Sequence, residues 1–389
     1  MGSELWRRQD SPAAPQAVLS ARRESLSLTQ GQDKVYTFDS EGRPFSFFIA
    51  GDFYQRGLGN TLLHKGRSQG QRFRQLLPPE QAESLLLQVW QEAAALGSEL
   101  PAGEARQVFE RILAWTPAKL AAEGRRFDEI YRPISILPPD QYLSLVLQLS
   151  EGCSYNRCSF CDFYKSRPFR IKSVQAFREH VQAVKEFLGA GASLRKGIFL
   201  ADGDALMTPQ PRLRECIGIL RETYPDLPLY SFMDAFRPQA KSVAEFSELA
   251  RLGLKRVYLG IETGDAELLH WLDKPGNPQL MQAEATKIKA AGLSLGLIFM
   301  VGAGGRPYAL THRLASTAWL RQLPLDREDF VFLSEFIPHR DQPYAAKAQA
   351  AGIEPFTPVE MKAEIAAWRK DLQGLSARLV PYHLREFVY

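Results

Sequence analysis

The sequence is poor in cysteine and has no long apolar run. Only 4 of its 389 residues are cysteine, which is typical of proteins from the reducing cytoplasm. A transmembrane helix needs about 18 or more consecutive apolar residues, and no window of the sequence offers them. The first residues, Met-Gly-Ser-Glu-Leu-Trp-Arg-Arg, also lack the apolar segment of a secretory signal. We therefore expect a cytoplasmic protein without a membrane partner.

A strong charge of either sign is missing as well. The net charge is +4, and the hydrophobic and charged fractions of 45% and 24% are ordinary for a globular protein. So small a charge does not favour a nucleic acid partner, although one run from Arg56 to Arg74 is locally basic. We interpret this run as a solvated face, with a nucleic acid contact as the alternative. The length exceeds a typical single core, so we expect one large catalytic domain and an accessory segment.

Three of the four cysteines stand close together. Cys153, Cys158 and Cys161 lie within nine positions, and the short gaps let three thiolates converge on one metal centre from a single loop. A zinc ion would want a fourth ligand, usually with a second Cys-x-x-Cys or His pair. The remaining cysteine, Cys216, stands alone in a helical pattern and is expected in the core. Three thiolates suit a 4Fe–4S cluster with one open iron, with a non-catalytic zinc-binding protein as the alternative.

After residue 140, apolar β-rich runs alternate with amphipathic helical patterns. The predicted strands are Tyr142–Ser150, Gly197–Ala201, Leu229–Met233, Lys255–Ile261, Leu295–Val301 and Phe330–Phe336. The predicted helices between them are Ser173–Leu188, Arg212–Thr223, Ser242–Leu252, Pro278–Ala291 and Tyr308–Leu323. This order is typical of right-handed βαβ units. The predicted fold class is α/β, a partial (β/α)6 TIM-like barrel with N-terminal and C-terminal helical additions, whose strand ends share one mouth with the cysteine loop.

The sequence predicts four segments. They are a polar leader (1–30), a mostly helical accessory segment (31–140), the barrel (141–340) and a C-terminal helical extension that packs on the barrel (341–389). Helices are expected around Pro79–Leu96 and Glu104–Ala122 in the accessory segment, and over Pro358–Leu375 in the extension. We expect the accessory segment to cover the barrel or to bind substrate.

Four segments of the predicted barrel follow the order of a known family. Phe160 precedes the last clustered cysteine, Phe199–Asp204 has the place of a Gly-Gly-Glu turn, and Tyr258–Gly264 and Ile298–Gly302 follow as the fourth and fifth strands. In this order, Tyr142–Pro338 resembles the radical S-adenosylmethionine (radical SAM) superfamily. The subgroup that it resembles most contains oxygen-independent coproporphyrinogen oxidases and methylthiotransferases. The usual family motif spaces its cysteines three and then two residues apart, whereas the first gap here is four.

The resemblance implies a reaction and its cofactors. A 4Fe–4S cluster on the three clustered cysteines would cleave S-adenosylmethionine reductively to a 5′-deoxyadenosyl radical. This radical would abstract hydrogen from a substrate that we expect to be a small molecule. The implied partner is an electron donor such as flavodoxin or ferredoxin. Modification of RNA or of a protein, with the basic N-terminal stretch as the contact surface, is the alternative.

The resemblance also implies roles for single residues. Asp204 takes the position of a carboxylate that contacts the methionine ammonium, with the N-cap of the following helix as its alternative. Glu262 is expected to act at the mouth as a catalytic residue, or else to cap the helix that begins near Ala266. The other residues implied to contact the cofactor are Phe160, Asp202, Gly203, Ser231, Asp234, Arg237 and Ile298.

The end of the sixth predicted strand is rich in polar side chains. Glu335, His339 and Arg340 are expected to orient a polar substrate, with Glu335 as a second catalytic residue. The alternative is a solvated loop with an ion pair between Arg340 and Asp341. A single spare cysteine leaves no room for a second all-cysteine cluster, which argues against methylthiotransferases. No cobalamin-type Asp-x-His-x-x-Gly segment is present either.

Overall fold

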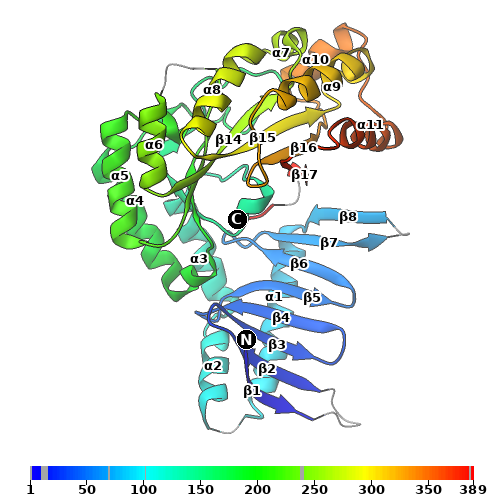
Figure 1. Ribbon diagram of the computed structural model, residues 1–389. Helices are drawn as coiled ribbons and strands as arrows, with labels where there is room; N and C mark the ends of the chain where they lie inside the picture. Colours follow the sequence, from blue (N-terminus) through cyan, green and yellow to red (C-terminus); the bar gives the residue numbers. More distant parts are fainter. Residues whose placement is uncertain (1, 10–15, 69–70, 101, 237–240, 385–386) are drawn as a thin grey trace. The chain divides into compact units, whose positions relative to one another are not determined.

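The computed structural model of the protein describes residues 2–9, 16–68, 71–100, 102–236, 241–384 and 387–389. The chain divides into two compact units (Figure 1). Unit 1 comprises residues 1–137, 182–196 and 385–389, and unit 2 comprises residues 138–181 and 197–384. Among the described residues, no helix is both long and apolar enough to cross a membrane.

Unit 1 begins with an eight-stranded antiparallel sheet in which each strand pairs with the next one along the chain. The strands are β1 (Ser3–Arg8), β2 (Ala17–Ala21), β3 (Ser25–Gln30), β4 (Lys34–Asp39), β5 (Pro44–Ile49), β6 (Asp52–Arg56), β7 (Leu62–Ser68) and β8 (Gln71–Leu76). Short turns join β2, β3, β4, β5, β6 and β7 in succession. Between β5 and β6, Ala50 and Gly51 both have a positive φ, of 51° and 92°, which matches the right-handed twist of a tight hairpin.

Three helices follow the sheet and cover one of its faces. They are α1 (Pro79–Gly97), α2 (Glu104–Leu113) and α3 (Pro117–Ile130). Buried apolar residues recur every three or four positions along α1, from Ala82 to Leu96, as expected for an amphipathic helix. Alternate strand residues such as Leu28 and Tyr36 are buried in the same cluster as the apolar residues of α1 and α2. The core of unit 1 therefore lies between the sheet and these helices.

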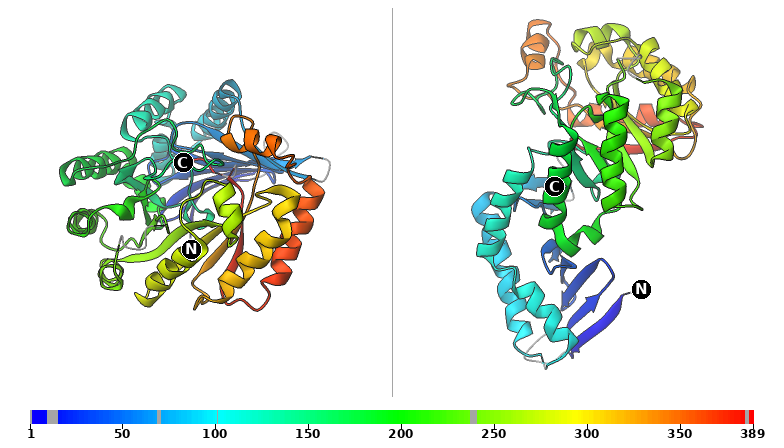
Figure 2. Two further views of the ribbon diagram at one scale, coloured as in Figure 1. Left: turned by 90° about the horizontal axis from the view of Figure 1, so that it is seen from above. Right: turned by 90° about the vertical axis from the view of Figure 1, so that its left-hand side faces the viewer.

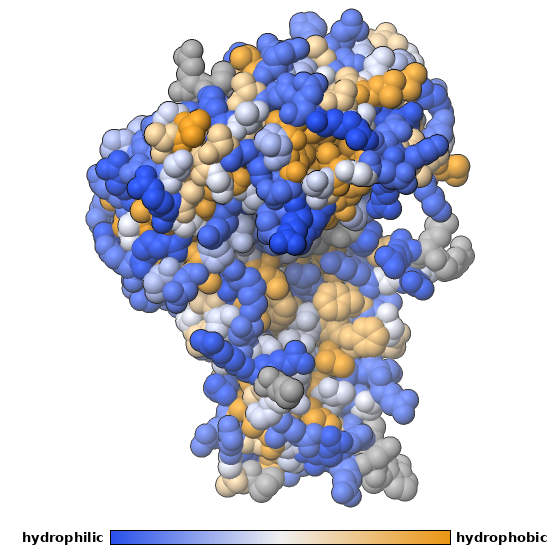
Figure 3. Space-filling view, viewed as in Figure 1, coloured by the Kyte–Doolittle hydropathy of each residue, from blue (hydrophilic) through white to orange (hydrophobic). Residues whose placement is uncertain are grey.

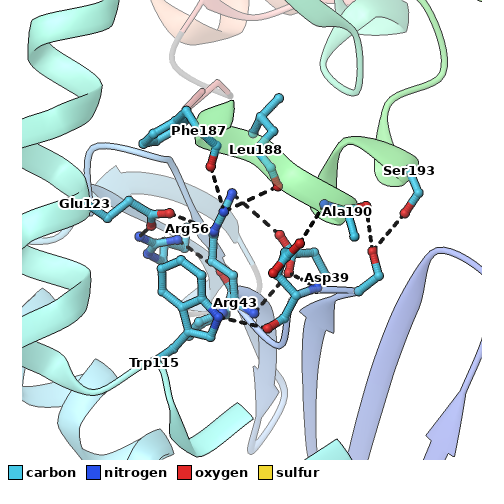
Figure 4. A network of polar contacts seen from close by, with 12 residues as sticks. Asp39, Arg43, Arg56, Trp115, Glu123, Phe187, Leu188, Ala190 and Ser193 are labelled. Carbon is cyan, nitrogen blue, oxygen red and sulfur yellow. Dashed lines mark hydrogen bonds and ion pairs between the residues drawn. The ribbon is translucent and has the colours of Figure 1, made fainter. Parts of the chain in front are cut away.

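A buried ion-pair network joins the turn between β4 and β5 to α3 (Figure 4). Glu123 on α3 lies 2.7 Å from Arg43 Nε and accepts from Arg56 Nη2 at 2.6 Å. Arg43 Nη1 lies 3.6 Å from Asp39, and its Nη2 donates to the carbonyl of Phe187 at 3.0 Å. All four charged side chains are buried. Two cations face two carboxylates, so the network is neutral as a whole.

This architecture corrects the prediction for the N-terminal part. Segment 1–30, predicted as a polar leader, contains β1, β2 and β3, and segment 31–140, predicted as mostly helical, contains five strands before its three helices. The strands are short, and one face of each carries Ser, Thr or charged residues, which conceals the apolar face in an average over the segment. In Ser25–Gln30, for example, only Leu26 and Leu28 are fully buried.

Unit 2 is built on a parallel sheet of seven strands in the order β17-β16-β15-β14-β13-β12-β9. These are β9 (Leu145–Gln148), β12 (Ile198–Ala201), β13 (Leu229–Phe232), β14 (Leu254–Glu262), β15 (Ser294–Val301), β16 (Phe330–Glu335) and β17 (Arg378–Tyr382). The helices after β9 are α4 (Val174–Leu188), of which residues 182–188 are counted in unit 1, α5 (Gln210–Thr223), α6 (Val243–Arg251), α7 (Ala266–Trp271), α8 (Pro278–Ala290), α9 (Gly305–Arg321), α10 (Pro343–Ala350) and α11 (Pro358–Asp371). The helices between successive strands lie on one face of the curved sheet (Figures 1 and 2). The predicted α/β partial barrel is confirmed.

The two faces of this sheet differ in what covers them. Phe299 packs against Trp319 of α9 and Trp368 of α11 on the helix-covered face. Five aromatic side chains form a row across the other, inner face: Phe199, Phe232, Tyr258, Phe332 and Tyr382. Gly296 of β15 makes room for this row, because a Cβ there would lie 2.2 Å from the ring of Tyr258.

The seventh strand was not predicted. Strand β17 comes from the segment predicted as a C-terminal helical extension, and it pairs in parallel with β16, with Arg378 opposite Phe330. The two helices α10 and α11 precede it. Strand β17 therefore extends the parallel sheet beyond the six predicted strands.

Candidate metal centre

The three clustered cysteines lie on a loop that a two-stranded ribbon closes at its base. Strand β10 (Ser150–Glu151) precedes the loop, strand β11 (Arg170–Ile171) follows it, and the two pair antiparallel. Glu151 accepts from Arg170 Nε at 2.7 Å and lies 3.1 Å from Lys172 Nζ. The ribbon thus fixes both ends of the cysteine loop, residues 152–169, next to the carboxyl end of β9.

Asp202, which follows β12, binds the first residues of the cysteine loop. Its Oδ1 accepts from Gln148 Nε2 at 2.9 Å, and its Oδ2 accepts from the backbone N–H of Gly152 at 3.0 Å. Arg167 Nη2 lies 3.1 Å from the same Oδ2. Burial raises the pKa of Asp202, while Arg167 and the two hydrogen bonds act in the opposite direction. These contacts place Asp202 beneath the loop, where it positions the backbone.

Gly203 brings the cysteine loop close to the end of β12. Its backbone N–H donates to the carbonyl of Gly152 at 3.3 Å. A Cβ at this position would lie 3.0 Å from the ring of Tyr164 and 3.3 Å from the Gly152 carbonyl oxygen. A side chain would therefore push the loop away from the strand, and glycine is the residue that permits the close approach.

The three clustered thiols are half-buried, and none of them forms a disulfide. Burial raises the pKa of Cys158 to about 12 and that of Cys161 to about 11, and it also raises the pKa of Cys153. Such thiols become thiolates when a metal ion replaces the proton. One backbone donor is already directed at the first sulfur, because the N–H of Asn156 lies 3.4 Å from Cys153 Sγ.

The donor set fits an iron–sulfur cluster. Three cysteine thiols on one loop, with a backbone N–H directed at a sulfur, are typical cluster ligands. In the part of the chain that the structure describes, no three Cys, His, Asp or Glu side chains are close enough to hold a single metal ion. The cysteines of one cluster bind different irons, so a cluster does not require them to meet at a single ion.

Two carboxylates face the cysteine loop from neighbouring strand ends. Ser154 Oγ donates to Asp204 Oδ2 at 2.6 Å and lies 3.4 Å from Asp234 Oδ2. The same Asp234 oxygen lies 3.9 Å from Cys153 Sγ. The N-cap residue of α5 is Pro209, so Asp204 does not cap that helix, and its side chain makes no capping hydrogen bond to the short 3₁₀ helix Ala205–Met207 either. The structure therefore places Asp204 in the group around the loop.

A buried lysine completes this group. Lys274 Nζ lies 3.5 Å from Glu262 Oε1 and 3.9 Å from Asp234 Oδ1. Burial acts to lower the pKa of Lys274, but Glu262, Asp234 and the nearby thiols outweigh it and raise the pKa, so the ammonium stays charged. Burial raises the pKa of Glu262, against the effect of Lys274. Glu262 does not cap α7, because Asp265 does so.

The backbone of β14 turns Glu262 toward this lysine. Its pairing with β15 is irregular between Gly260 and Glu262, and Glu262 has a φ of 64°. A Cβ on Gly260 would lie 2.5 Å from Glu262 Oε1 and 3.4 Å from Lys274 Nζ. Glycine two residues before the end of the strand therefore leaves the space that the ion pair fills.

The other predicted cofactor contacts do not all reach this group. Ser231 has the register of the helix-covered face, and its hydroxyl donates to the carbonyl of Leu200 at 2.9 Å. Phe160 packs with apolar residues of α7 and α10. Ile298 is buried on the inner face of β15, since it pairs with Phe332. Arg237 lies outside the described residues. The positions of Ser231 and Phe160 therefore do not support the predicted cofactor contacts, which stay predictions.

Glu335 ends β16 at the same carboxyl edge of the sheet. Its carboxylate lies 3.8 Å from His383 Nδ1, and both side chains are partly exposed. The residues that follow, His339, Arg340 and Asp341, are exposed. The strand end therefore carries the polar side chains that the sequence predicts, and their role in substrate binding stays a prediction.

Sequence reasoning missed Lys274 and Ser154. Lys274 lies in the loop between α7 and α8, and no periodic pattern of neighbouring residues indicates that its side chain is buried. Ser154 directly follows Cys153, and this position next to the first predicted cluster ligand could have identified it as a site residue. Both residues matter to the site because they link carboxylates from three strand ends to the cysteine loop.

Comparisons with known proteins find a family match for one region of the chain. Residues 147–311 match the Radical SAM superfamily, and no curated protein matches the chain. Coproporphyrinogen III oxidase HemN from Escherichia coli is 15% identical with a TM-score of 0.44, over 63% of this chain and 54% of HemN. Methylornithine synthase PylB is 16% identical with a TM-score of 0.43, over 77% and 85%. The cobalamin-dependent enzyme OxsB is 17% identical with a TM-score of 0.39, and this chain spans only 29% of its length.

Proposed function

We propose that the protein cleaves S-adenosylmethionine reductively at a 4Fe–4S cluster, because its residues 147–311 belong to the radical SAM superfamily. One observation carries the proposal. Three cysteines of a single loop lie beside a buried lysine and three carboxylates, at the carboxyl ends of parallel strands. In α/β barrels this edge is where active sites are built.

Cys153, Cys158 and Cys161 would hold the cluster and leave one iron open. A bound cluster would supply the one electron needed to cleave the C–S bond of S-adenosylmethionine to methionine and a 5′-deoxyadenosyl radical. The protein contributes position and the exclusion of water. Asp202 and Gly203 hold the cysteine loop against β12, and the aromatic row of the inner face keeps the interior apolar.

The charges around the cysteine loop suit the amino acid part of S-adenosylmethionine. This cofactor carries a sulfonium and an ammonium against a single carboxylate, so it is a cation overall. Asp234 and Glu262 present two carboxylates to one ammonium, that of Lys274, and Asp204 accepts from Ser154 beside them. In the proposed arrangement Asp204 and Asp234 accept from the cofactor ammonium, and Lys274 donates to the cofactor carboxylate. Carboxylates at this edge of the sheet favour a cationic ligand.

The substrate is proposed to bind at the same edge of the sheet. Glu335 and His383, at the ends of β16 and β17, present a carboxylate and an imidazole there. Such a pair orients a polar small molecule by hydrogen bonds. An electron donor such as flavodoxin or ferredoxin would reduce the cluster.

Iron and sulfide analysis tests the proposal. Protein reconstituted without oxygen should bind about four irons and four sulfides per chain. Replacing any one of Cys153, Cys158 or Cys161 by Ala should abolish this content. The matched control is Cys216→Ala, which should leave it intact, because Cys216 is a buried core residue of α5. Stoichiometric zinc without sulfide would contradict the proposal and support the zinc-binding alternative.

A further inference from the structure

We infer that His312 and Thr263 are positioning residues for the ion pair of Glu262 and Lys274. His312 lies on α9, and Thr263 directly follows Glu262, the last residue of β14. Both side chains are buried, with exposed fractions of 1% and 0%. The inference deepens the proposed function and rests on it, because Lys274 is proposed to donate to the cofactor carboxylate.

The surroundings of His312 are apolar. Its ring packs against that of Trp368, with 4.9 Å between the ring centroids, and Figure 3 shows apolar side chains gathered over β15 and β16. Burial lowers the pKa of His312 to about 4, so the ring is neutral at physiological pH. A polar atom without a partner is costly in such surroundings. The hydrogen bonds of this ring therefore fix the residues that they join.

His312 joins the carboxyl ends of two neighbouring strands. Its Nε2 lies 3.0 Å from the carbonyl oxygen of Met300 on β15, and its Nδ1 lies 2.7 Å from Thr263 Oγ1. A carbonyl oxygen only accepts, so the proton of the neutral ring is on Nε2, and Nδ1 accepts from the threonine hydroxyl. The same hydroxyl accepts from the backbone N–H of Asp265 at 3.0 Å. Both ring nitrogens and the hydroxyl therefore have partners.

A second side chain of α9 holds the residue after Thr263. The hydroxyl of Ser316 accepts from the backbone N–H of Gly264 at 2.8 Å. A Cβ on Gly264 would lie 2.7 Å from the carbonyl oxygen of Ala315, so the turn after β14 lies directly against α9. Ser316 is four residues after His312 and therefore on the same side of the helix. The two side chains hold the turn together.

These contacts hold Glu262 in an unfavourable backbone conformation. Its φ of 64° lies in the left-handed region, which a residue with a Cβ seldom adopts. Such a conformation persists only where the surrounding structure enforces it. In this conformation Glu262 Oε1 lies 3.5 Å from Lys274 Nζ. Without the contacts to α9, the backbone would relax to a negative φ and turn the carboxylate away from the lysine.

The hydroxyl of Thr263 is also connected to the lysine. Asp265, whose N–H donates to this hydroxyl, caps the first turn of α7 with its carboxylate. Lys274 follows α7, and its backbone N–H donates to the carbonyl of Leu269 in that helix at 3.0 Å. Thr263 therefore acts on Glu262 through the chain and on Lys274 through α7.

Chemical labelling of Lys274 tests the inference without any turnover. The full-length protein, with and without its cluster, is treated with acetic anhydride, which acylates only the neutral amine, and mass spectrometry measures the modified lysine. Thr263→Val keeps the shape of the side chain but removes the hydroxyl. It should separate Lys274 from Glu262 and lower the pKa of the lysine, which should make labelling about tenfold faster. His312→Leu should have the same effect.

Two matched variants separate this effect from a general loss of packing. Thr263→Ser keeps the hydroxyl and should be labelled like the parent protein. Thr317→Val removes a buried hydroxyl of α9 that donates to the carbonyl of Leu314 at 3.1 Å, and it should also be labelled like the parent protein. Parental labelling of Thr263→Val, or equal acceleration in both Thr→Val variants, would overturn the inference.

The kinetics of S-adenosylmethionine cleavage give a second measurement. A displaced Lys274 binds the cofactor carboxylate less well, so Thr263→Val should raise KM about tenfold and change kcat less. Thr263→Ser and Thr317→Val should leave KM within about twofold, although all three variants should melt below the parent protein. An equal rise of KM in all three would overturn the inference. Absence of cleavage by the parent protein would contradict the proposed function instead, and the labelling would still decide the inference.

Discussion

Each unit buries a group of charged side chains, and the two groups differ in their balance. In unit 1, two arginines face two carboxylates (Figure 4), and one arginine also donates to a backbone carbonyl. In unit 2, Lys274 faces two carboxylates, Glu262 and Asp234, beside the cysteine loop. A balanced group satisfies its own charges and fixes the fold around it. An unbalanced group keeps charge that a ligand of opposite sign can neutralise, which is a property of binding sites.

The largest expected effect is on stability, when one glutamate in each charged group is replaced by glutamine. Glu123→Gln leaves Arg43 and Arg56 buried without one of their two anions, which should lower the free energy of unfolding by ~3–5 kcal/mol. Glu262→Gln removes part of an excess of negative charge, and it should be neutral or stabilising by ~1 kcal/mol. Chemical denaturation of both variants measures the difference. Equal losses of stability would break the comparison.

The buried side chain of His312 carries no charge at neutral pH, so it can be compared with the two charged groups. Burial lowers the pKa of His312 to about 4 from 6.5, while Asp265 and the carbonyl of Met300 act to raise it. The unfolded chain therefore binds this proton more tightly, and the stability present at neutral pH is lost as pH falls from about 6.5 toward 4, by up to ~3 kcal/mol.

Melting temperatures between neutral pH and about pH 5 measure this loss. His312→Gln keeps a neutral polar side chain of similar size and is the matched variant. It should show a shallower decline with acid than the parent protein. Parallel declines would mean that other groups control the acid response.

Lys274 tests whether the unbalanced group binds the cofactor. Lys274→Met should lower S-adenosylmethionine cleavage about 10- to 150-fold, the equivalent of ~1.5–3 kcal/mol for a lost charge-assisted hydrogen bond. Lys274→Arg keeps the positive charge and should lose less. Iron and sulfide content measured in parallel should be unchanged in both. Loss of the cluster in Lys274→Met would instead give this lysine a role in holding the loop.

The smallest effect is expected at the end of β16. Glu335 is partly exposed, and its ion pair with His383 is long, at 3.8 Å. Glu335→Gln should therefore leave stability within ~0.5 kcal/mol, and cluster content and substrate-free cofactor cleavage should not change. Turnover of the true substrate should fall. Normal turnover would place the substrate elsewhere.

The sequence predicted the barrel well and the N-terminal sheet badly, for one physical reason. Strands of a parallel sheet are buried on both faces, so Leu295–Val301 stands out as an apolar run. Strands such as Ser25–Gln30 bury only one face, and the average over the strand appears polar. The period-2 alternation of Ser-Leu-Ser-Leu was the signal that identifies such a strand. Strand β17 was missed because it is short and contains Pro381.

The residues of the candidate site were likewise predicted only in part. The cysteine loop and the carboxylates at strand ends were predicted, because their spacing and their place after strands are visible in the sequence. Lys274 was not, since its approach to Glu262 depends on a bulge in β14 and on the missing side chain of Gly260. Ser231 has the register of the other face of its strand, and only the observed register shows this.

We propose that the cysteine loop and the charged group around Lys274 together cleave S-adenosylmethionine reductively. Analysis of the reaction products tests this proposal. Anaerobically reconstituted protein is reduced, supplied with S-adenosylmethionine, and analysed by mass spectrometry, with Cys153→Ala as the control. We expect 5′-deoxyadenosine and methionine in equal amounts from the parent protein, and neither product above background from the variant. Methylthioadenosine as the main product, or equal product from both proteins, would contradict it.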